Sequence, residues 1–493
     1  MQQNTNYIED ATRARYQDVG LLLGPLVFAL FMFFDGSQSI MPQEAWRVAA
    51  VGLWMAVWWA TEAIPVPVTA FIPLVAFDIL KVASFKEAAM PFSNPIIFLF
   101  LGAFLLAIAV EKCNLHKRIA LAILGVTGTQ STRLIGGFML VGAFLSMWMS
   151  NTSTTLMLMP ICISVVKVIT DNSTSATDRQ KTHFQIAMLL GLAYSTTIGG
   201  LSTLIGTPPN ALLAAFLAEN YHMQIDFISW MKVGVPISLI MLPLAWLLLT
   251  RVLFKVDIKV DDSVSEHFAQ LRKELGVMSS AEKRVGIIFL VVISLWILRR
   301  PLTEWIGITG VTDAGIAMLA ALMLFLVPKG GNSQCRLLNW HDASMVPWGV
   351  LILFGGGLSL ASAVSSSGLA MFLGESLQPL TIFGIAVLII AATGLVIFLT
   401  ELTSNLATAA TLLPVVAAIA MQSDLSPLLL TVPVTLAASC AFMLPVATPP
   451  NAIVFASGYL TIPQMVRSGV MLNIIGMILL SLVAVWWAPY ILL

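Results

Sequence analysis

The sequence predicts an all-α polytopic membrane protein with two inverted repeats, two re-entrant hairpins and discontinuous helices at the binding site. Three observations carry this prediction. The 493 residues are 58% hydrophobic and only 10% charged, with a mean hydropathy of +0.92, which is more apolar surface than a soluble core needs. The apolar runs are long and continuous, which favours helices over the roughly ten-residue alternation of a barrel. Polar, proline-rich breaks interrupt these runs twice.

Apolar spans follow one another along the chain. The first, 20–34, comes after a polar start without a small-residue cleavage site, so it is expected to be an uncleaved helix. The others lie at roughly 46–61, 64–80, 95–111, 119–128, 134–149, 153–169, 185–205, 211–218, 234–254, 285–298, 312–328, 346–364, 369–374, 382–400, 406–421, 427–446, 452–457 and 468–493. Several are too short to cross about 30 Å of hydrocarbon at about 1.5 Å per residue. These short segments are expected to form hairpins or broken helices, which leaves about 11 transmembrane helices.

Two kinds of polar cluster each occur twice inside the apolar stretches. Ser150-Asn151-Thr152 and Ser404-Asn405-Leu406 are the first kind, and the Thr-Pro-Pro-Asn sequences at 207–210 and 448–451 are the second. Backbone that carries such clusters is tolerated at membrane depth only where it lines a cavity. Duplicated breaks of this kind indicate a transporter binding site.

An internal repeat relates these clusters. Leu99-Phe100-Leu101-Gly102 matches Leu353-Phe354-Gly355-Gly356 at an offset of 254, and Ser150-Asn151 matches Ser404-Asn405 at the same offset. The Thr-Pro-Pro-Asn pair is offset by 241, so the second half has a shorter loop. If 134–169 and 382–421 are hairpins that enter and leave on one side, five crossings separate corresponding elements. An odd number of crossings inverts the second repeat.

The basic residues predict the orientation. With the N-terminus inside, the inner segments hold 19 of the 25 lysines and arginines, as the positive-inside rule requires. We therefore expect a cytoplasmic N-terminus and an outer C-terminus. The polar segment 255–284 is then a cytoplasmic linker, and its apolar residues at 264, 268, 271 and 275 predict an amphipathic helix at the membrane interface.

The hairpin tips offer oxygen ligands and helix ends together. One arm presents unpaired carbonyls and the other unpaired N–H groups. Oxygens of Ser146, Ser150 and Asn151 can supply the hard-oxygen shell of a small cation, while the positive helix end near Thr152 suits a carboxylate. The second tip offers the same arrangement at Thr400, Ser404 and Asn405.

The double prolines complete the predicted site. Proline removes a donor and ends the helix, so carbonyls near 199–206 and near Ala447 are released from the helical ladder. The hydroxyls of Thr207 and Thr448 can then hydrogen-bond a ligand.

Fixed positive charge is absent around these clusters. No lysine or arginine occurs at 134–166, 182–231 or 337–466. Burying an unpaired anion is very costly, so bound cations would have to neutralise an anionic ligand. Glu401, beside the second tip, has two alternative roles: it relays protons, or it is structural and accepts hydrogen bonds from tip amides.

Other reactive residues carry no pattern of their own. The four cysteines lack metal or disulfide spacing, and the five histidines lack paired spacing, which argues against a metal or catalytic centre. The balanced formal charge gives no indication of a nucleic-acid partner.

At SMWMSNTSTT, IGTPPN, SNLATAATLLP and MLPVATPPN, the chain resembles the divalent anion/sodium symporter family. The resemblance covers nearly the whole chain and implies transport of dicarboxylates, or in some members citrate, with co-transported sodium ions across a bacterial inner membrane. It further implies a homodimer, in which each protomer has a scaffold and a transport domain that moves as an elevator. The expected segments are 1–129 and 285–380 for the scaffold, 130–254 and 381–493 for the transport domain, and 255–284 for the linker.

The resemblance also implies roles for individual residues. The first sodium site would use Ser146, Ser150, Asn151 and the backbone at Gly199. The second would use Thr400, Asn405 and backbone near Thr403 and Ala447. Substrate carboxylates would meet the following set: Ser150, Asn151, Thr152, Thr207, Ser404, Asn405, Thr448 and Pro449.

One position departs from the family pattern. The second signature is often Ser-Asn-Thr, and Leu406 here replaces the threonine, which removes a hydroxyl donor and adds bulk at a position that bears on substrate choice. Exchanger relatives that work without sodium can carry a basic side chain in place of the cation, and none stands near the tips here, which favours a symporter.

These observations lead to one expectation and two alternatives. We expect a sodium-coupled secondary transporter, not an enzyme, that imports C4 dicarboxylates such as succinate, malate or fumarate. The nearer alternative is a sodium-independent dicarboxylate exchanger or a proton-coupled transporter of another anion. The distant one is a polytopic membrane enzyme, which would need a constellation such as His-Glu-x-x-His that the sequence lacks.

Overall fold

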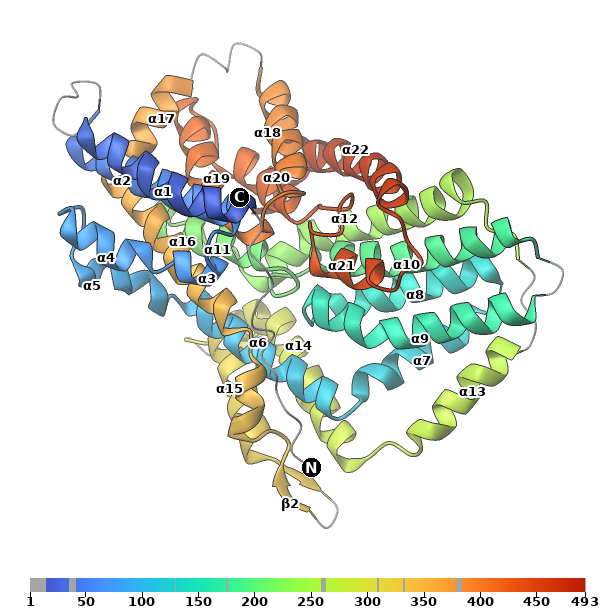
Figure 1. Cartoon of the computed structure of the whole chain (residues 1–493). Helices are drawn as coiled ribbons and strands as arrows, with labels where there is room; N and C mark the ends of the chain where they lie inside the picture. The colour runs from blue at the N-terminus through green and yellow to red at the C-terminus, as the bar shows by residue number, and fades with distance from the viewer. Residues whose placement is uncertain are drawn as a thin grey trace.

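A computed structural model describes residues 15–34, 41–128, 130–173, 176–258, 263–307, 310–330, 333–377 and 384–492. The described chain is predominantly helical (Figure 1). Parts of the predicted segments therefore lie outside the described residues, among them 1–14, 259–262 and 378–383.

The first predicted scaffold segment forms a chain of helices, in which α6 is long and mostly buried. Its elements are α1 (Arg15–Phe33), α2 (Gln43–Thr61), α3 (Val66–Thr69), α4 (Ile72–Ile79), α5 (Phe85–Ala89), the 3₁₀ helix η1 (Met90–Ser93), α6 (Pro95–Lys112) and α7 (Leu115–Thr127). Pro95 begins α6, where its missing N–H costs nothing, and the side chain of Asn94 caps the helix by accepting the N–H of Ile96. Most of α6 is buried, which places it inside the molecule rather than at its lipid-facing surface.

The next segment contains a helical pair, a broken helix and a long span. These are α8 (Ser131–Ser146) and α9 (Asn151–Asn172), then α10 (Asp178–Gly200) and α11 (Pro208–Tyr221), then α12 (Phe227–Leu247) with its π-helical end η2 (Leu248–Leu253). With 16 residues, α8 is about 24 Å long at about 1.5 Å per residue, which is shorter than a hydrocarbon core. Figure 1 shows α8, α9 and α10 side by side, and α10 packs against both of the others.

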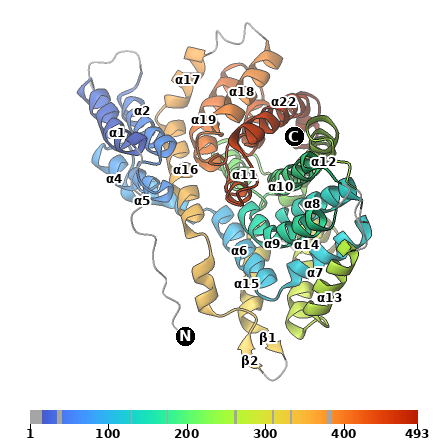
Figure 2. The ribbon, with the colours of Figure 1, turned by 45° about the vertical axis from the view of Figure 1, so that its right-hand side comes forward.

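The third segment holds the linker helix and further spans. Its elements are α13 (Ser263–Leu275), α14 (Ser280–Ile306), α15 (Asp313–Leu326), strands β1 (Pro328–Gly330) and β2 (Ser333–Arg336), the 3₁₀ helix η3 (Trp340–Met345), α16 (Trp348–Ser366) and α17 (Leu369–Leu377). The antiparallel pair β1–β2 departs from the all-α prediction. The pair is a short hairpin between α15 and η3, and its strands are too short to be predicted from the sequence. It projects from the same end of the molecule as α13 (Figure 2).

The last segment resembles the second in its order of elements. It runs α18 (Ile385–Leu399), α19 (Asn405–Gln422), α20 (Leu428–Ala438), α21 (Pro449–Phe455), α22 (Ile462–Trp486) and α23 (Ala488–Leu492). As in the second segment, a helical pair is followed by a helix that breaks before a double proline and then by a long span. This order agrees with an internal repeat.

Seven helices in the described residues are long and apolar enough to cross a membrane, and five further apolar stretches are shorter. A helix, α13, lies within the segment 255–284, where the apolar period predicts one. Its Val264 and Phe268 are buried, and it packs against α7 and α9, so its apolar face is covered by protein.

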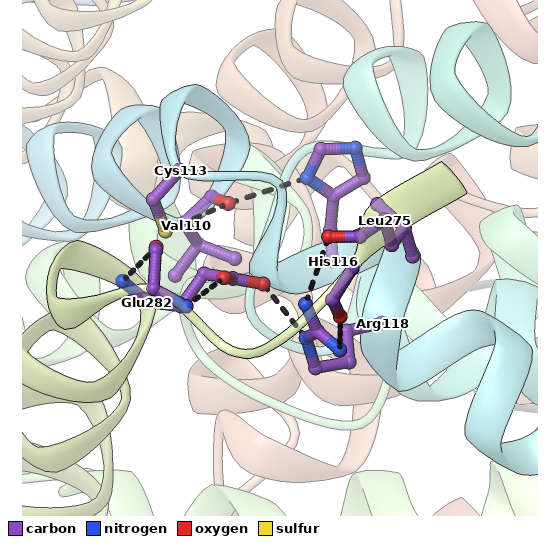
Figure 3. Close-up of polar contacts among 8 residues, drawn as sticks. Val110, Cys113, His116, Arg118, Leu275 and Glu282 are labelled. Carbon is purple, nitrogen blue, oxygen red and sulfur yellow. Dashed lines mark hydrogen bonds and ion pairs between the residues drawn. The ribbon is translucent and has the colours of Figure 1, made fainter. Parts of the chain in front are cut away.

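Polar contacts fix α13 to its neighbours (Figure 3). Arg118 of α7 pairs with Glu282 of α14 at 2.7 Å and donates to the carbonyls of Leu275 and Gly276, where α13 ends. Arg272 of α13 donates to Leu121 of α7 at 2.7 Å. The two arginines thereby join α7, α13 and the start of α14 into one unit, which we call the α13 end of the molecule.

Candidate functional site

The first tip is the turn between α8 and α9. Ser150 is the N-cap of α9, and its hydroxyl accepts the N–H of Ser153 at 3.2 Å. Helix α9 begins at Asn151, one residue before the predicted position near Thr152. Ser150, Asn151, Thr152 and Ser153 of this first turn line the cavity described below.

Behind this tip, oxygen atoms converge on Asn151. Its amide oxygen lies 2.5 Å from the hydroxyl of Ser146, 3.1 Å from the carbonyl of Thr196 and 3.3 Å from the carbonyl of Gly206. Two arrangements satisfy such a cluster: the amide turns so that its nitrogen donates to the carbonyls, or a cation sits among the oxygens. A sodium ion needs this kind of oxygen-only surrounding.

The second tip, between α18 and α19, repeats the arrangement with different hydrogen bonds. The hydroxyl of Thr400 contacts the amide oxygen of Asn405 at 2.9 Å and the carbonyl of Ala438 at 2.8 Å. Ser404 is the N-cap residue of α19. Thr403 donates to the carbonyl of Leu399 at 3.0 Å, so its side chain fixes the turn.

The two helix breaks are held by asparagines in equivalent places. Asn210 donates to the carbonyls of Gly200, Leu201 and Thr203 in the first break, and Asn451 donates to those of Ala441 and Leu444 in the second. The last residue of each Thr-Pro-Pro-Asn therefore satisfies carbonyls that the helix has released. Sequence reasoning named the prolines and threonines but missed this role of the asparagines.

Glu401 organises the second break. It is 2% exposed, and its carboxylate accepts the backbone N–H groups of Phe442, Met443 and Leu444 at 2.7–3.1 Å and the side-chain amide of Asn473 at 2.8 Å. The predicted acceptor role is confirmed, but the donors belong to the break rather than to the tip. All four of its hydrogen-bond partners are donors, so the side chain of Glu401 acts as an acceptor that holds the break in place.

Close backbone approach brings the first break against the first tip. A Cβ at Gly199 would lie 2.2 Å from the carbonyl oxygen of Ala143, and one at Gly206 would lie 2.4 Å from that of Gly200. Only glycine allows these approaches. They place the released carbonyls beside Asn151.

Both tips and both breaks face one cavity of about 1250 Å³. Most of the predicted site residues line it: Ser150, Asn151, Thr152, Thr207, Thr403, Ser404, Asn405, Ala447, Thr448 and Pro449. Ser146, Gly199 and Thr400 do not, because they lie fully buried behind the tips. This division separates atoms that could hold a buried cation from atoms that could contact a solute in the cavity.

The cavity is lined by apolar side chains that include Phe100, Phe104 and Leu353, by the hydroxyls and amides of the tips, and by the acidic residues Glu62 and Glu111. Among its lining residues in the described part of the chain, none is lysine, arginine or histidine. Leu406 lines the cavity and is 5% exposed. It stands where the repeat places Thr152 in the first tip, so the two tips differ in chemistry.

Comparison with known proteins places these features in context. A family model described as the sodium:sulfate symporter transmembrane region matches residues 17–493. The sodium-dependent dicarboxylate transporter SdcS of Staphylococcus saprophyticus is 41% identical over 476 residues, covering 96% of this chain and 92% of that protein. SdcS of Staphylococcus aureus USA300 is 41% identical over 481 residues, covering 97% and 92%.

A solved structure shares the fold. The YdaH transporter of Alcanivorax borkumensis, whose structure is described as having an unusual topology, superposes with a TM-score of 0.59 at 12% identity, covering 96% of this chain and 99% of that one.

Proposed function

Because the chain belongs to the sodium:sulfate symporter family, we propose that it is an integral membrane transporter that imports C4 dicarboxylates together with sodium ions. The two staphylococcal proteins, with which it shares 41% of residues over nearly their whole length, are sodium-dependent dicarboxylate transporters. The family and these relatives are transporters, which removes the membrane-enzyme alternative.

The observation that carries the proposal is the composition of the cavity. Two helix N-termini and a set of hydroxyls and amides face it, while no cationic side chain in the described lining can balance a dianion. Helix ends supply partial positive charge of roughly half a unit each. Co-bound sodium ions supply the rest.

Each tip provides one proposed sodium site. The first consists of Ser146, Ser150, Asn151 and the backbone at Gly199, with the carbonyls of Thr196 and Gly206 as additional ligands suggested by their distances to Asn151. The second consists of Thr400, Thr403, Asn405 and the backbone at Ala447. The second site requires more rearrangement, because Thr400 already contacts both Asn405 and the carbonyl of Ala438.

The substrate lies between the tips in this proposal. One carboxylate meets Ser150, Asn151, Thr152 and Thr207, and the other meets Ser404, Asn405, Thr448 and the backbone beside Pro449. The hydroxyl of Thr207 lies 3.2 Å from that of Ser439 in the second break. This contact joins the two halves next to the proposed substrate.

The architecture of the family resemblance completes the proposal. Two inverted repeats are supported by the shared order of elements and by the matched roles of Asn210 and Asn451. On this basis α8–α9 and α18–α19 are re-entrant hairpins among eleven crossings, the N-terminus is cytoplasmic and the C-terminus outside. Segments 130–254 and 381–493 form the transport domain of a homodimer and move as an elevator against 1–129 and 285–380, with 255–284 as the linker.

Uptake into proteoliposomes tests the function. Labelled succinate is offered with an inward sodium gradient, with choline in place of sodium, or with a pH gradient alone, and citrate, malate and sulfate compete for uptake. We expect accumulation only with sodium, and competition by malate. Equal uptake in choline would contradict sodium coupling, and competition by sulfate but not malate would move the substrate to the inorganic anion of the family's name.

A further inference from the structure

Two neighbouring helices, α14 and α15, carry exposed apolar stripes. The stripe of α14 begins with Ile287, Leu290 and Val291, and the stripe of α15 ends with Leu322 and Leu326; these side chains are 51–64% exposed. Their spacing of three and four residues places each set on one helix face. In an integral membrane protein such apolar faces contact lipid chains.

The hairpin β1–β2, which projects at the α13 end (Figure 2), lies immediately beyond both stripes. Arg284 of α14 donates to the carbonyl of Pro328 in β1 and so holds the hairpin against the start of α14. Pro328 is two residues after Leu326, and Arg284 is three residues before Ile287. At about 1.5 Å per residue, this junction lies within roughly 5 Å of the end of each stripe. It is therefore at the depth where hydrocarbon gives way to lipid headgroups.

Three exposed cationic side chains flank this junction. Lys283 precedes Arg284, Lys329 follows Pro328, and Arg336 pairs with Pro328 across the hairpin. The ion pairs of the described residues involve none of the three. Their charged groups therefore face the surroundings of the protein.

The carboxylates that flank the junction in the sequence already have cations of their own. Residues 327–340 contain no aspartate or glutamate. Glu282, which is 4% exposed, pairs with Arg118 at 2.7 Å and accepts the N–H of Ser279 (Figure 3). Asp342, which is 7% exposed, pairs with Lys112 at 2.6 Å. Neither carboxylate offsets the three exposed charges.

An exposed tryptophan beside the hairpin supports the same depth. Trp340 begins η3, is 79% exposed, and its ring lies 6.5 Å from that of Phe325 on α15. Tryptophan is enriched where hydrocarbon meets headgroups, because its ring is apolar and its N–H is polar. Phe325 is next to Leu326, so the tryptophan lies near the end of the α15 stripe.

We propose that Lys283, Lys329 and Arg336 form a binding surface for the phosphate of an anionic phospholipid in the surrounding membrane. Charge and depth both favour this partner. Three cations without an offsetting carboxylate attract a phosphodiester, and the acyl chains of the same lipid can lie along the stripes of α14 and α15. A zwitterionic lipid binds less well, because its own positive group is repelled by these cations. The inference goes beyond the proposed transport function and does not depend on which solute is carried.

Hydrogen exchange of the β1 and β2 amides, in full-length protein in nanodiscs, tests this surface. Nanodiscs of phosphatidylcholine are compared with nanodiscs that contain phosphatidylglycerol, and a third sample adds inorganic phosphate to the phosphatidylcholine nanodiscs. The test variant combines Lys283→Gln with Lys329→Gln. The matched control combines Lys81→Gln with Lys86→Gln, which removes the same charge from two exposed lysines away from the hairpin.

We expect phosphatidylglycerol to slow exchange of the hairpin amides by roughly fivefold in the unmodified protein and in the control. The test variant should lose most of this slowing, since each lysine near an anionic surface strengthens binding by about fivefold. Equal exchange in the two kinds of nanodisc overturns the surface, and so does undiminished slowing in the test variant. Equal slowing by inorganic phosphate overturns the lipid as the partner, because the surface then takes any small anion.

A charge-retaining variant separates binding from folding. Lys283→Arg combined with Lys329→Arg keeps both positive charges and both phosphate donors, so it must retain the slowing by phosphatidylglycerol. Loss of the slowing in this variant contradicts the proposal. The arginine variant also keeps the test decisive if the glutamine variant does not yield monodisperse protein.

Discussion

Glu401→Gln gives the sharpest test of how the second half of the site is built. The carboxylate accepts three backbone N–H groups and the amide of Asn473. Glutamine has the same shape but one oxygen, so its NH₂ group would face the N–H groups of Met443 and Leu444. At least two charge-assisted hydrogen bonds are lost, and the new NH₂ donor faces two buried N–H donors without an acceptor between them.

The magnitude follows from these contacts. Losing two hydrogen bonds to a charged group, at roughly 1.5 kcal/mol each, destabilises the break by about 3 kcal/mol. The second proposed sodium site takes its backbone ligand at Ala447 from this break. If half of that loss falls on the sodium-loaded conformation, apparent sodium affinity falls about tenfold.

Two assays measure the outcome. Thermal unfolding in detergent, with and without sodium, should show a lower midpoint for Glu401→Gln and a smaller stabilisation by sodium. Uptake of succinate at varied sodium should show the weaker affinity. Glu111→Gln, which alters a half-buried carboxylate on the cavity wall with no part in the break, is the control. A variant that unfolds at the original temperature and transports with unchanged sodium dependence would refute the reasoning.

Three further predictions concern the first tip, both asparagines and the orientation. Asn151→Ala and Asn405→Ala should each abolish sodium-driven uptake without loss of membrane insertion; normal uptake by both variants would show that the sodium sites are misplaced. Gly199→Ala should cost about 1–3 kcal/mol by overpacking against the backbone of α8, seen as a lower unfolding midpoint, whereas Gly286→Ala, whose Cβ would meet its nearest neighbour at 3.6 Å, should be tolerated. An impermeant thiol reagent should label exposed Cys335 only from the cytoplasmic side; labelling from outside would reverse the proposed orientation.

The sequence predicted those parts of the fold that depend on local chemistry. Proline is favoured in the first turn of a helix, where its missing N–H leaves no helical hydrogen bond unmade, and Pro208 and Pro449 begin α11 and α21. Ser150 caps a helix because its hydroxyl accepts a free N–H of the first turn. The period of apolar residues placed α13, since Val264 and Phe268 lie four residues apart on one face.

The sequence did not predict the roles of residues whose partners lie far away in the chain. Nothing near Glu401 shows that its partners lie about 40 positions later in a break that has no regular structure of its own. In the same way, the sequence shows Asn210 only as a polar residue after two prolines. Its role depends on the folded break, in which its side-chain amide donates to three backbone carbonyls. The family resemblance supplied the candidate site residues, whereas the structure separates those behind the tips from those on the cavity wall.

The division between buried and cavity-facing residues bears on coupling. A dicarboxylate in this cavity would meet hydroxyls, amides and helix ends but no cationic side chain in the described lining, which also contains the acidic residues Glu62 and Glu111. Its transfer through the membrane interior would leave two charges unbalanced, which is very costly at low dielectric. Ser146 and Thr400, buried behind the two tips, are placed so that one cation behind each tip would offset one carboxylate in front of it. On the proposed sites, we therefore expect binding of the anion to depend on more than one sodium ion.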